Sequence, residues 1–185
     1  MKLISDKYKQ QNTILHSKGF GGSGWRWVDI VVDIINDLGI SSMLDYGCGQ
    51  STLYAEINNK YPYLFTKIEY KEYDPCIESK SICPGAAELV TCTDVLEHIE
   101  PKYIDNVINH IMSLTKVLVF FNVNVKEANK KLPDGRNAHL IIRKPMWWYN
   151  KLKEVFTNDD WVFKILPVDN PKNFNVVIIK REFKQ

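Results

Sequence analysis

The stretch MLDYGCGQSTL, residues 43–53, decides the fold, because a strand end, a glycine turn and a helix start follow one another directly within it. The apolar run that leads into it, residues 40–44, is typical of a short buried strand. Gly47 and Gly49 interrupt this strand, and Ser51 stands where a helix-capping residue is expected. Glycines let the backbone turn sharply and approach a ligand closely, so the stretch predicts a ligand at the start of the helix.

Length and composition predict one domain over residues 1–185. With 45 % apolar residues, the chain can bury a sizeable core. Its longest apolar run, residues 117–123, is far shorter than the roughly 20 residues of a membrane helix. Residues 1–6 lack the apolar core of a signal peptide. We therefore expect a cytoplasmic protein without a membrane partner, and the sequence leaves its oligomeric state open.

The cysteines contain no Cys-x-x-Cys pair; they are Cys48, Cys76, Cys83 and Cys92. This spacing indicates neither a zinc site nor a disulfide framework. The expectation is therefore a set of reduced, half-buried thiols.

The spacing of apolar residues predicts alternating strands and helices, preceded by an irregular segment over residues 1–24. Besides the helix after the glycines, helices are expected over residues 25–38, 101–114 and 145–156, and strands over residues 65–73, 87–93, 116–123, 161–166 and 173–183. This order predicts an α/β fold: a doubly wound, mostly parallel sheet with helices on both faces and a C-terminal antiparallel hairpin. Such sheets bind ligands beyond the carboxyl ends of their strands.

Two classes of cofactor fit a glycine turn at this edge, dinucleotides and S-adenosylmethionine. Thr52 stands where the dinucleotide fingerprint has its third glycine. Asp45 lies two residues before Gly47, where a carboxylate would repel a pyrophosphate but can help to hold an ammonium-bearing ligand through the loop. These residues favour S-adenosylmethionine.

The segment Asp45-Tyr46-Gly47-Cys48-Gly49 resembles the first motif of the class I S-adenosylmethionine-dependent methyltransferases, which have a Rossmann-like fold. Asp74 lies 25 residues beyond Gly49, where this family has the carboxylate that binds both ribose hydroxyls. The segment LVTCTDVLEHIEP, residues 89–101, resembles the fourth strand and following turn of the ubiquinone-biosynthesis type. The resemblance covers residues 25–123 and implies methyl transfer to an oxygen or nitrogen atom.

The resemblance implies a cofactor site built from several loops. It assigns cofactor binding to Gly22, Asp45, Gly47, Gly49, Asp74, Thr93 and Asp94. Residues 1–24 would form a lid, because the segment before the first long helix often folds over the cofactor in this family. Residues 19–24 are rich in glycine, which permits such a close approach. Simpler alternatives stay open: turn glycines without a ligand, a plain linker before the helix, and Glu69 or Glu72 in place of Asp74 at the ribose.

The chain departs from the family beyond Asp74. Only 13 residues separate Asp74 from Glu88, too few for the usual helix, third strand and acidic adenine-contacting turn. We therefore expect an abbreviated adenine side, with the third strand very short or absent, and assign no carboxylate to the adenine.

Asp94, Glu97 and His98 are spaced so that one helical turn places their side chains on the same face. A similar turn is the divalent-metal site of small-RNA 3′-terminal 2′-O-methyltransferases and of ubiquinone-pathway O-methyltransferases, and His139 is a candidate further ligand. In many methyltransferases the turn instead caps a helix and orients a loop, and this role is favoured over metal binding. Without a metal, Asp94, His98 and His139 are the catalytic candidates, the histidines as general bases for a hydroxyl or amine.

Residues 124–149 are expected to form a substrate-side insertion, because they follow the fifth strand of the family's sheet at the ligand-binding edge. Residues 126–153 carry a net charge of +6, whereas the whole chain carries +2. With Trp147, Trp148 and Tyr149, this charge predicts an anionic or aromatic acceptor: a nucleotide, an RNA or DNA end, or a phosphorylated or carboxylated metabolite. The alternative is a solvated lysine face with the tryptophans in the core.

Three functions follow from the sequence, in decreasing order of preference. The first is an S-adenosylmethionine-dependent methyltransferase acting on oxygen or nitrogen of a small-molecule or nucleic-acid acceptor. The second is a non-catalytic S-adenosylmethionine-binding module, favoured if the abbreviated adenine side weakens turnover. The third, a dinucleotide-dependent oxidoreductase, is disfavoured by Thr52 and by the expected terminal hairpin.

Overall fold

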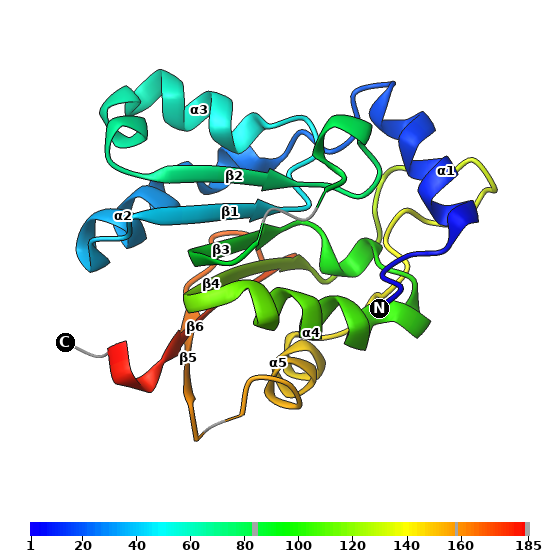
Figure 1. Ribbon diagram of the computed structural model, residues 1–185. Coiled ribbons are helices and arrows are strands. Elements are labelled where there is room, and N and C mark those ends of the chain that lie inside the picture. Colours follow the sequence, from blue (N-terminus) through cyan, green and yellow to red (C-terminus); the bar gives the residue numbers. More distant parts are fainter. Residues whose placement is uncertain (83–84, 158, 184–185) are drawn as a thin grey trace.

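The computed structural model describes residues 1–82, 85–157 and 159–183, which form one six-stranded sheet with helices on both faces (Figure 1). The helices are α1 (Asp6–His16), α2 (Val28–Leu38), α3 (Thr52–Lys60), α4 (Ile104–Leu114) and α5 (Pro145–Lys153). The strands are β1 (Ser42–Tyr46), β2 (Glu69–Tyr73), β3 (Ala87–Thr93), β4 (Thr115–Asn124), β5 (Trp161–Leu166) and β6 (Asn173–Lys180). Short 3₁₀ turns lie at Gly24–Trp27, Pro62–Thr66, Glu78–Lys80, Leu96–His98, Pro101–Tyr103 and Arg181–Phe183.

The strand order is β2-β1-β3-β4-β6-β5. Strands β2, β1, β3 and β4 are parallel, whereas β6 lies antiparallel between β4 and β5. The predicted doubly wound, mostly parallel sheet and its C-terminal antiparallel hairpin are therefore confirmed. Because parallel strands end at one edge of a sheet, the loops after β1, β2, β3 and β4 meet there.

β2 is the edge strand of the sheet, beside β1. Among the described residues between β2 and β3, the structure has one 3₁₀ turn and no strand. For these residues, the expected abbreviation of the adenine side is confirmed. Charged side chains at the free edge disfavour pairing with a strand of another chain. Lys71 pairs with Glu69 at 3.3 Å, and Lys80 pairs with Glu72 at 3.4 Å.

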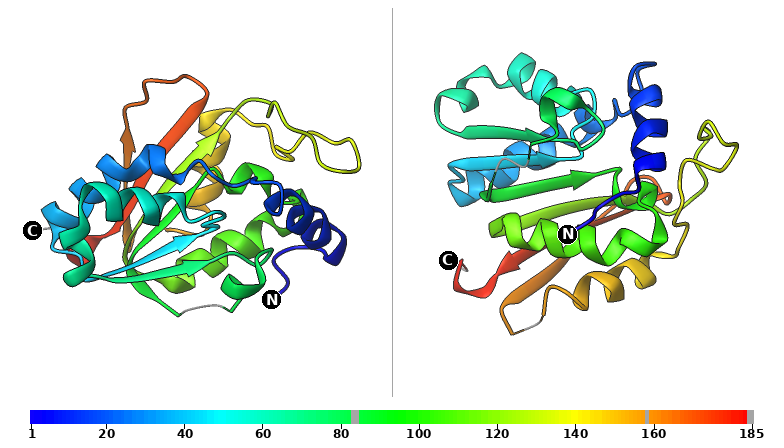
Figure 2. Two further views of the ribbon diagram at one scale, coloured as in Figure 1. Left: turned by 90° about the horizontal axis from the view of Figure 1, so that it is seen from above. Right: turned by 45° about the vertical axis from the view of Figure 1, so that its right-hand side comes forward.

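Two hydrophobic cores lie on the two faces of the sheet. Helices α2 and α3 cover one face, and α4 and α5 cover the other (Figure 2). Phe120 of β4 packs in the core beneath α2 and α3, whereas its neighbour Phe121 packs in the core beneath α4 and α5. A strand that is covered on both faces needs apolar residues at successive positions, which accounts for the apolar residues 117–121.

The prediction that residues 1–24 are irregular is wrong, because they contain α1. Ser5 caps this helix, its hydroxyl oxygen accepting from the Tyr8 N–H at 3.1 Å. The Ser5 N–H and hydroxyl in turn donate to the Glu100 carboxylate at 2.7 and 2.9 Å. These bonds hold α1 beyond the carboxyl ends of the strands (Figure 1). Two of the three buried residues of α1 are polar, Gln11 and Asn12, so the helix has no apolar stripe for the sequence to reveal.

Two local predictions also need correction. Ser51 precedes α3, but its side chain does not cap the helix, because its backbone is left-handed with a φ of +57°. The Lys80 ammonium donates to the Ser51 hydroxyl instead. Phe65 lies in a 3₁₀ turn, and the strand predicted to begin there begins at Glu69.

The described cysteines are free and buried rather than half-buried; they are Cys48, Cys76 and Cys92. Cys83 lies outside the described residues. Within the described part of the chain, the helices are too short or too polar to span a bilayer.

Candidate functional site

The loop after β1 presents its backbone at the carboxyl edge of the sheet. The N–H groups of Gly47 and Cys48 both donate to the Tyr73 carbonyl of β2, at 2.7 and 3.2 Å. Gly47 has a φ of +78°, and a Cβ at this position would lie 2.5 Å from Cγ2 of Val95. Only glycine fits there, so contacts with β2 and with the segment after β3 fix the turn.

Asp74 follows β2 and faces the same loop. Its Oδ2 accepts from the Gly49 N–H at 3.2 Å, and its Oδ1 accepts from the Cys76 N–H at 2.9 Å. Nε2 of His16, at the end of α1, lies 3.7 Å from Oδ2. The rival acids of β2 pair with lysines at the sheet edge instead. The structure thus places Asp74 in direct contact with the glycine loop, whereas Glu72 is connected to it through Lys80, which donates to the Gly49 carbonyl at 3.0 Å.

A mostly apolar cavity lies beneath α1. Gly47, Asp74 and Asp94 all line it, so it joins the ends of β1, β2 and β3. Apolar lining comes from Ile4, Pro75, Val95 and Ile99, among others. An apolar pocket with a few convergent polar groups is the usual form of a small-molecule site.

The other predicted cofactor residues lie around this cavity rather than on its walls. Gly49 lines a separate cavity, and Gly22 lines a third one. Asp45 and Thr93 are buried within the sheet. Any effect of Asp45 on a ligand therefore acts through the loop that follows it.

Asp45 is a buried acid with two hydroxyl partners. It accepts from the Thr91 hydroxyl at 3.1 Å and from the Tyr70 hydroxyl at 3.3 Å. Burial raises the pKa of Asp45 to about 7; the Thr91 bond opposes this shift and the Glu72 charge adds to it. Ionisation of Asp45 therefore lowers the stability of the folded chain.

Asp45→Asn is expected to remove part of the pH dependence of stability. The folded pKa, about 7, exceeds the usual 3.8, so the folded chain holds an extra proton between these values. The stabilisation from protonated Asp45 is complete below pH 3.8 and is lost as the pH rises to about 7. Melting curves should show the variant gaining roughly 5–10 °C over the native chain between pH 4 and pH 8. A difference that stays constant with pH would contradict this expectation.

The segment between α1 and α2 lies on the glycine loop. The Gln50 N–H donates to the Gly21 carbonyl at 2.9 Å, and a Cβ at Gly49 would lie 2.3 Å from that oxygen. The Gln50 side-chain amide donates to the carbonyls of His16 and Phe20 at 2.8 and 3.2 Å. Backbone contacts therefore hold this segment against the loop.

Gly49→Ala is expected to dislodge this segment, because the new methyl group would overlap the Gly21 carbonyl. Gly39→Ala is the matched control: Gly39 also has a left-handed φ, +62°, but no atom lies within 4 Å of the added carbon. Left-handed strain alone costs about 1–2 kcal/mol. The overlap should cost Gly49→Ala about 2 kcal/mol more in urea unfolding. Equal losses in the two variants would mean that the segment does not rest on Gly49.

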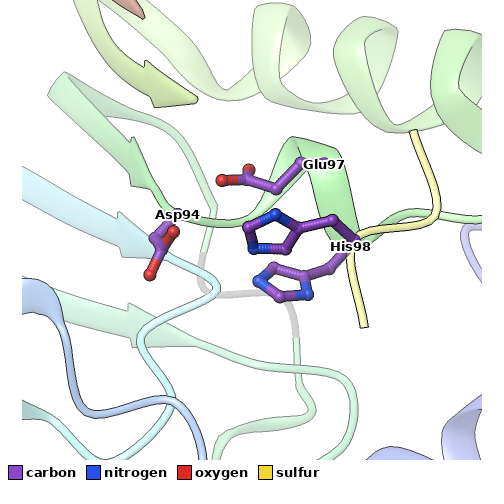
Figure 3. A group of neighbouring side chains, drawn as sticks. Asp94, Glu97 and His98 are labelled. Carbon is purple, nitrogen blue, oxygen red and sulfur yellow. The ribbon is translucent and has the colours of Figure 1, made fainter. Parts of the chain in front are cut away.

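Asp94, Glu97, His98 and His139 form one cluster beside the cavity. Each offers one ligand atom, and these atoms all lie within 4.8 Å of one another. The side chains of Asp94, Glu97 and His98 converge (Figure 3). Asp94 follows β3 with a φ of +60°, and Leu96–His98 form a 3₁₀ turn rather than an α-helical one. His139 comes from the segment between β4 and α5, so tertiary structure completes the cluster.

Backbone carbonyls orient both imidazoles. Nδ1 of His98 lies 2.8 Å from the Ala138 oxygen, and Nδ1 of His139 lies 2.5 Å from the Lys126 oxygen. A carbonyl oxygen only accepts, so each Nδ1 carries a proton, and Nε2 is the ring nitrogen that remains for a metal ion. Metal-binding histidines generally have this arrangement.

The carboxylates of the cluster have different environments. Glu97 Oε1 accepts from the Asn124 N–H at 2.6 Å, and a hydrogen bond joins the Glu97 carboxyl group to the Asp94 carboxylate. Burial, together with the Asp94 charge, raises the pKa of Glu97 well above its usual value. Burial opposes ionisation of Asp94, but the His98 imidazole and the Ser23 hydroxyl hold its pKa below the usual value. Burial lowers the pKa of His98 to about 4, so this imidazole is neutral at pH 7.

A second cavity, the acceptor-side cavity, opens from the cluster toward the predicted insertion. Its lining includes Gly22, Arg26, Asn124, Lys130, His139 and Lys172. Residues 124, 127–130 and 139 of the predicted insertion therefore contribute to it. The aromatic residues at the end of the insertion do not: Trp148 is fully buried in the core, and Trp147 and Tyr149 pack against that core. The structure supports the core alternative for these aromatic side chains, whereas basic side chains do reach the cavity.

The sequence interpretation missed the contribution of α1. Tyr8, Asn12 and His16 line the cavity beneath this helix, and the Tyr8 hydroxyl donates to the His98 carbonyl. A signal was present, because Ser5 directly before Asp6 is a typical helix start. The contact itself joins residues 90 positions apart and has no local signature.

No protein-family model matches the chain, and no curated protein matches it in sequence. An O-methyltransferase family protein from Burkholderia thailandensis is similar in structure, with a TM-score of 0.57 at 14 % identity, over 98 % of this chain and 64 % of that one. The Pnkp1/Rnl/Hen1 RNA repair complex matches with a TM-score of 0.54 at 13 % identity, over 84 % of this chain and 41 % of that one. Magnesium protoporphyrin IX methyltransferase from Synechocystis PCC 6803, with bound S-adenosylhomocysteine, matches with a TM-score of 0.53 at 15 % identity, over 84 % of this chain and 83 % of that one.

These likenesses establish the fold, which is the Rossmann-like fold of the class I methyltransferases. The resemblance read from the sequence is confirmed at this level, and the matches do not single out the ubiquinone-biosynthesis type. The chain spans less than two thirds of the length of the first two matched structures.

Proposed function

We propose that this chain is an S-adenosylmethionine-dependent methyltransferase that methylates an oxygen or nitrogen atom of its acceptor. One observation carries the proposal: Gly47, Asp74 and Asp94 line a single cavity, and the Asp94 cluster lies at its side. The fold supports it, as does a matched methyltransferase with bound S-adenosylhomocysteine.

In this proposal the cofactor occupies the cavity beneath α1 after this helix moves outward, because the cavity volume, about 90 Å³, is below the roughly 300 Å³ of a ligand pocket. Asp74 accepts hydrogen bonds from the ribose hydroxyls, for which each carboxylate oxygen has a second lone pair. Pro75, Val95 and Ile99 enclose the adenine by apolar packing, consistent with the abbreviated adenine side. The missing Cβ of Gly47 lets the methionine part lie against the backbone. Helix α1 and the segment after it act as the lid.

The four-residue cluster fits a divalent metal ion. It offers two imidazole nitrogens and two carboxyl groups whose ligand atoms all lie within 4.8 Å of one another. This donor set suits Mn²⁺, Fe²⁺ or Zn²⁺. Such an ion would polarise an acceptor hydroxyl and lower its pKa. These observations support metal binding, although the sequence alone favoured a capping role.

The acceptor enters through the acceptor-side cavity. Arg26, Lys130 and Lys172 line this cavity against Asp94 and Glu127. Cations at the ligand-binding edge attract an anionic acceptor such as the end of a nucleic-acid strand. A matched structure belongs to an RNA repair complex, which supports RNA over a small anionic metabolite.

The reaction itself asks for alignment more than for reactive side chains. The S–CH₃ bond of the cofactor breaks, an O–CH₃ or N–CH₃ bond forms, and S-adenosylhomocysteine leaves. The proton of the acceptor passes to water in the acceptor-side cavity, because a bound metal ion would occupy the Nε2 atom of each imidazole. The lid would exclude water from the cofactor, and the two cavities would place the acceptor in line with the methyl group.

Thermal-shift titration tests the class of cofactor. At 100 times its Kd, S-adenosylhomocysteine should stabilise the fold by about 2.7 kcal/mol, which is a rise of several degrees in melting temperature. NAD⁺ should leave the melting temperature unchanged. A rise with NAD⁺ alone would favour the oxidoreductase alternative.

Transfer of a labelled methyl group to pooled RNA, DNA and metabolite fractions tests the activity. Label should enter the RNA fraction, disappear with EDTA and return with MnCl₂. Binding of S-adenosylhomocysteine without label in any fraction would support the non-catalytic module instead.

A further inference from the structure

Four asparagines form an amide ladder where β4 ends and β6 begins. In the antiparallel register, Asn122 lies opposite Asn175, and Asn124 lies opposite Asn173. Nδ2 of Asn122 donates to Oδ1 of Asn175 at 2.7 Å. Residues two apart on a strand share a face, so all four side chains lie on one face of the sheet. All four also line one open cavity, the amide cavity.

The ladder occupies positions on the sheet face beneath α2 and α3, where the neighbouring residues of β4 and β6 are apolar and belong to the core. The preceding pair on this face, Phe120 and Val177, packs in the core beneath α2. Asn122 and Asn175 are 1 % and 2 % exposed, although asparagine is unfavourable in strands and costly to bury. Within the described chain, their one side-chain bond is to each other. It leaves the Asn122 carbonyl and the Asn175 amide N–H groups side by side for a ligand.

Apolar surfaces complete the amide cavity. They come from Trp27 and Ile30 at the start of α2 and from Pro167 and Val168 between β5 and β6. Trp27 packs edge-on against Phe120, with ring centroids 6.0 Å apart, and its buried indole N–H has no partner among the described residues. A flat ring in this cavity would find apolar packing together with unpaired donors and acceptors.

The amide cavity adjoins the acceptor-side cavity. Ser23, Arg26, Asp94 and Asn124 line both. The backbone of Asn124 also donates to Glu97 of the cluster. A molecule whose reacting group lies at the cluster can therefore extend into the amide cavity.

The two cavities differ in charge. The ionisable residues around the amide cavity are Arg26, Asp29, Asp94 and Asp169. Three acids against one base disfavour a phosphate there. Lys130 and Lys172 line the acceptor-side cavity instead. This separation favours phosphate groups at the acceptor-side cavity and an uncharged polar ring at the ladder.

We propose that the amide cavity binds a nucleobase of the acceptor. This inference rests on the proposed function and names the part of the acceptor that lies next to the reacting group. A nucleobase is a flat, uncharged heterocycle with adjacent donors and acceptors, which an asparagine amide matches in pairs. Stacking on Trp27 adds affinity for any base, whereas the ladder discriminates among bases.

Binding of three fluorescein-labelled hexaribonucleotides, rA₆, rC₆ and rU₆, tests the proposal by fluorescence anisotropy with S-adenosylhomocysteine and MnCl₂ present. One good amide-to-base pair discriminates by about 5- to 150-fold, so the tightest and weakest Kd should differ at least about fivefold. In Asn122→Leu/Asn175→Leu this spread should shrink to less than about twofold. Replacing both partners leaves no buried amide unpaired, which preserves the fold. Asn58→Ala, exposed on α3, is the control and should keep the spread.

Asn175→Asp serves if the double variant fails to fold, because it keeps an acceptor for the bond from Asn122 and replaces the amide donor by a carboxylate oxygen. It should weaken the tightest oligonucleotide at least about fivefold. A native spread below twofold, or a double variant that keeps the native spread, overturns the proposal. Thermal shifts on the same proteins separate the two proposals. If the native chain binds S-adenosylhomocysteine but no oligonucleotide, only the proposed nucleobase site is contradicted. If it binds neither, the proposed function is contradicted as well.

Discussion

His139→Ala is expected to lower methyl transfer at least about 100-fold, because it removes one of the two imidazoles of the cluster. His139 lines the acceptor-side cavity and not the cavity beneath α1. The Kd for S-adenosylhomocysteine should therefore stay within about threefold of the native value. MnCl₂ should raise the melting temperature of the native chain and not that of the variant.

His110→Ala is the control for this prediction. His110 lies on α4, half-buried, with Nδ1 2.9 Å from the Tyr46 hydroxyl, and does not belong to the cluster. Its replacement should leave methyl transfer within about threefold. Methyl transfer by His139→Ala at the native rate would contradict the proposed role of the cluster. A joint loss of transfer and of S-adenosylhomocysteine binding would point to a disturbed fold.

Asp74→Asn is expected to weaken S-adenosylhomocysteine binding at least about 100-fold, because two hydrogen bonds to a charged acceptor are each worth about 1.5–3 kcal/mol. The variant keeps the size of the side chain but loses its charge and one acceptor. Isothermal titration of S-adenosylhomocysteine measures the effect directly.

Glu72→Gln is the matched control for Asp74→Asn. Glu72 pairs with Lys80 at 3.4 Å and does not line the cavity beneath α1. It should change the affinity less than about threefold. A large loss in Glu72→Gln with a small loss in Asp74→Asn would transfer the ribose role to the rival acid. Melting curves of both variants show whether the Gly49 loop has kept its structure.

Local sequence patterns correctly predicted elements whose apolar residues pack in the two cores of the sheet. Helix α2 could be predicted because its apolar residues recur at helical spacing and Gly39 ends it in a left-handed cap. β4 could be predicted because burial on both faces requires a continuous apolar run. Helix α1 could not, because its buried face is largely polar and contacts loops rather than the sheet.

The candidate site divides in the same way. Gly47, Gly49 and Asp74 were readable because the glycine turn and the end of the next strand have their own local signatures. The amide ladder was not readable, because Asn122 and Asn175 are 53 residues apart and only their register makes them partners. Both roles stayed open for Trp148, since a tryptophan in a basic stretch does not reveal whether it faces a ligand or the core, and the structure places it in the core.

The sequence by itself determined the order of strands and helices from residue 25 onward, the glycine turn and the acid at the end of β2, because these depend on residues that are close along the chain. Only the tertiary structure decided that α1 covers the cavity, that His139 joins Asp94, Glu97 and His98, and which side chains line the neighbouring cavity. Those contacts join loops that meet at one edge of a parallel sheet, and strand order and register set them rather than any local periodicity.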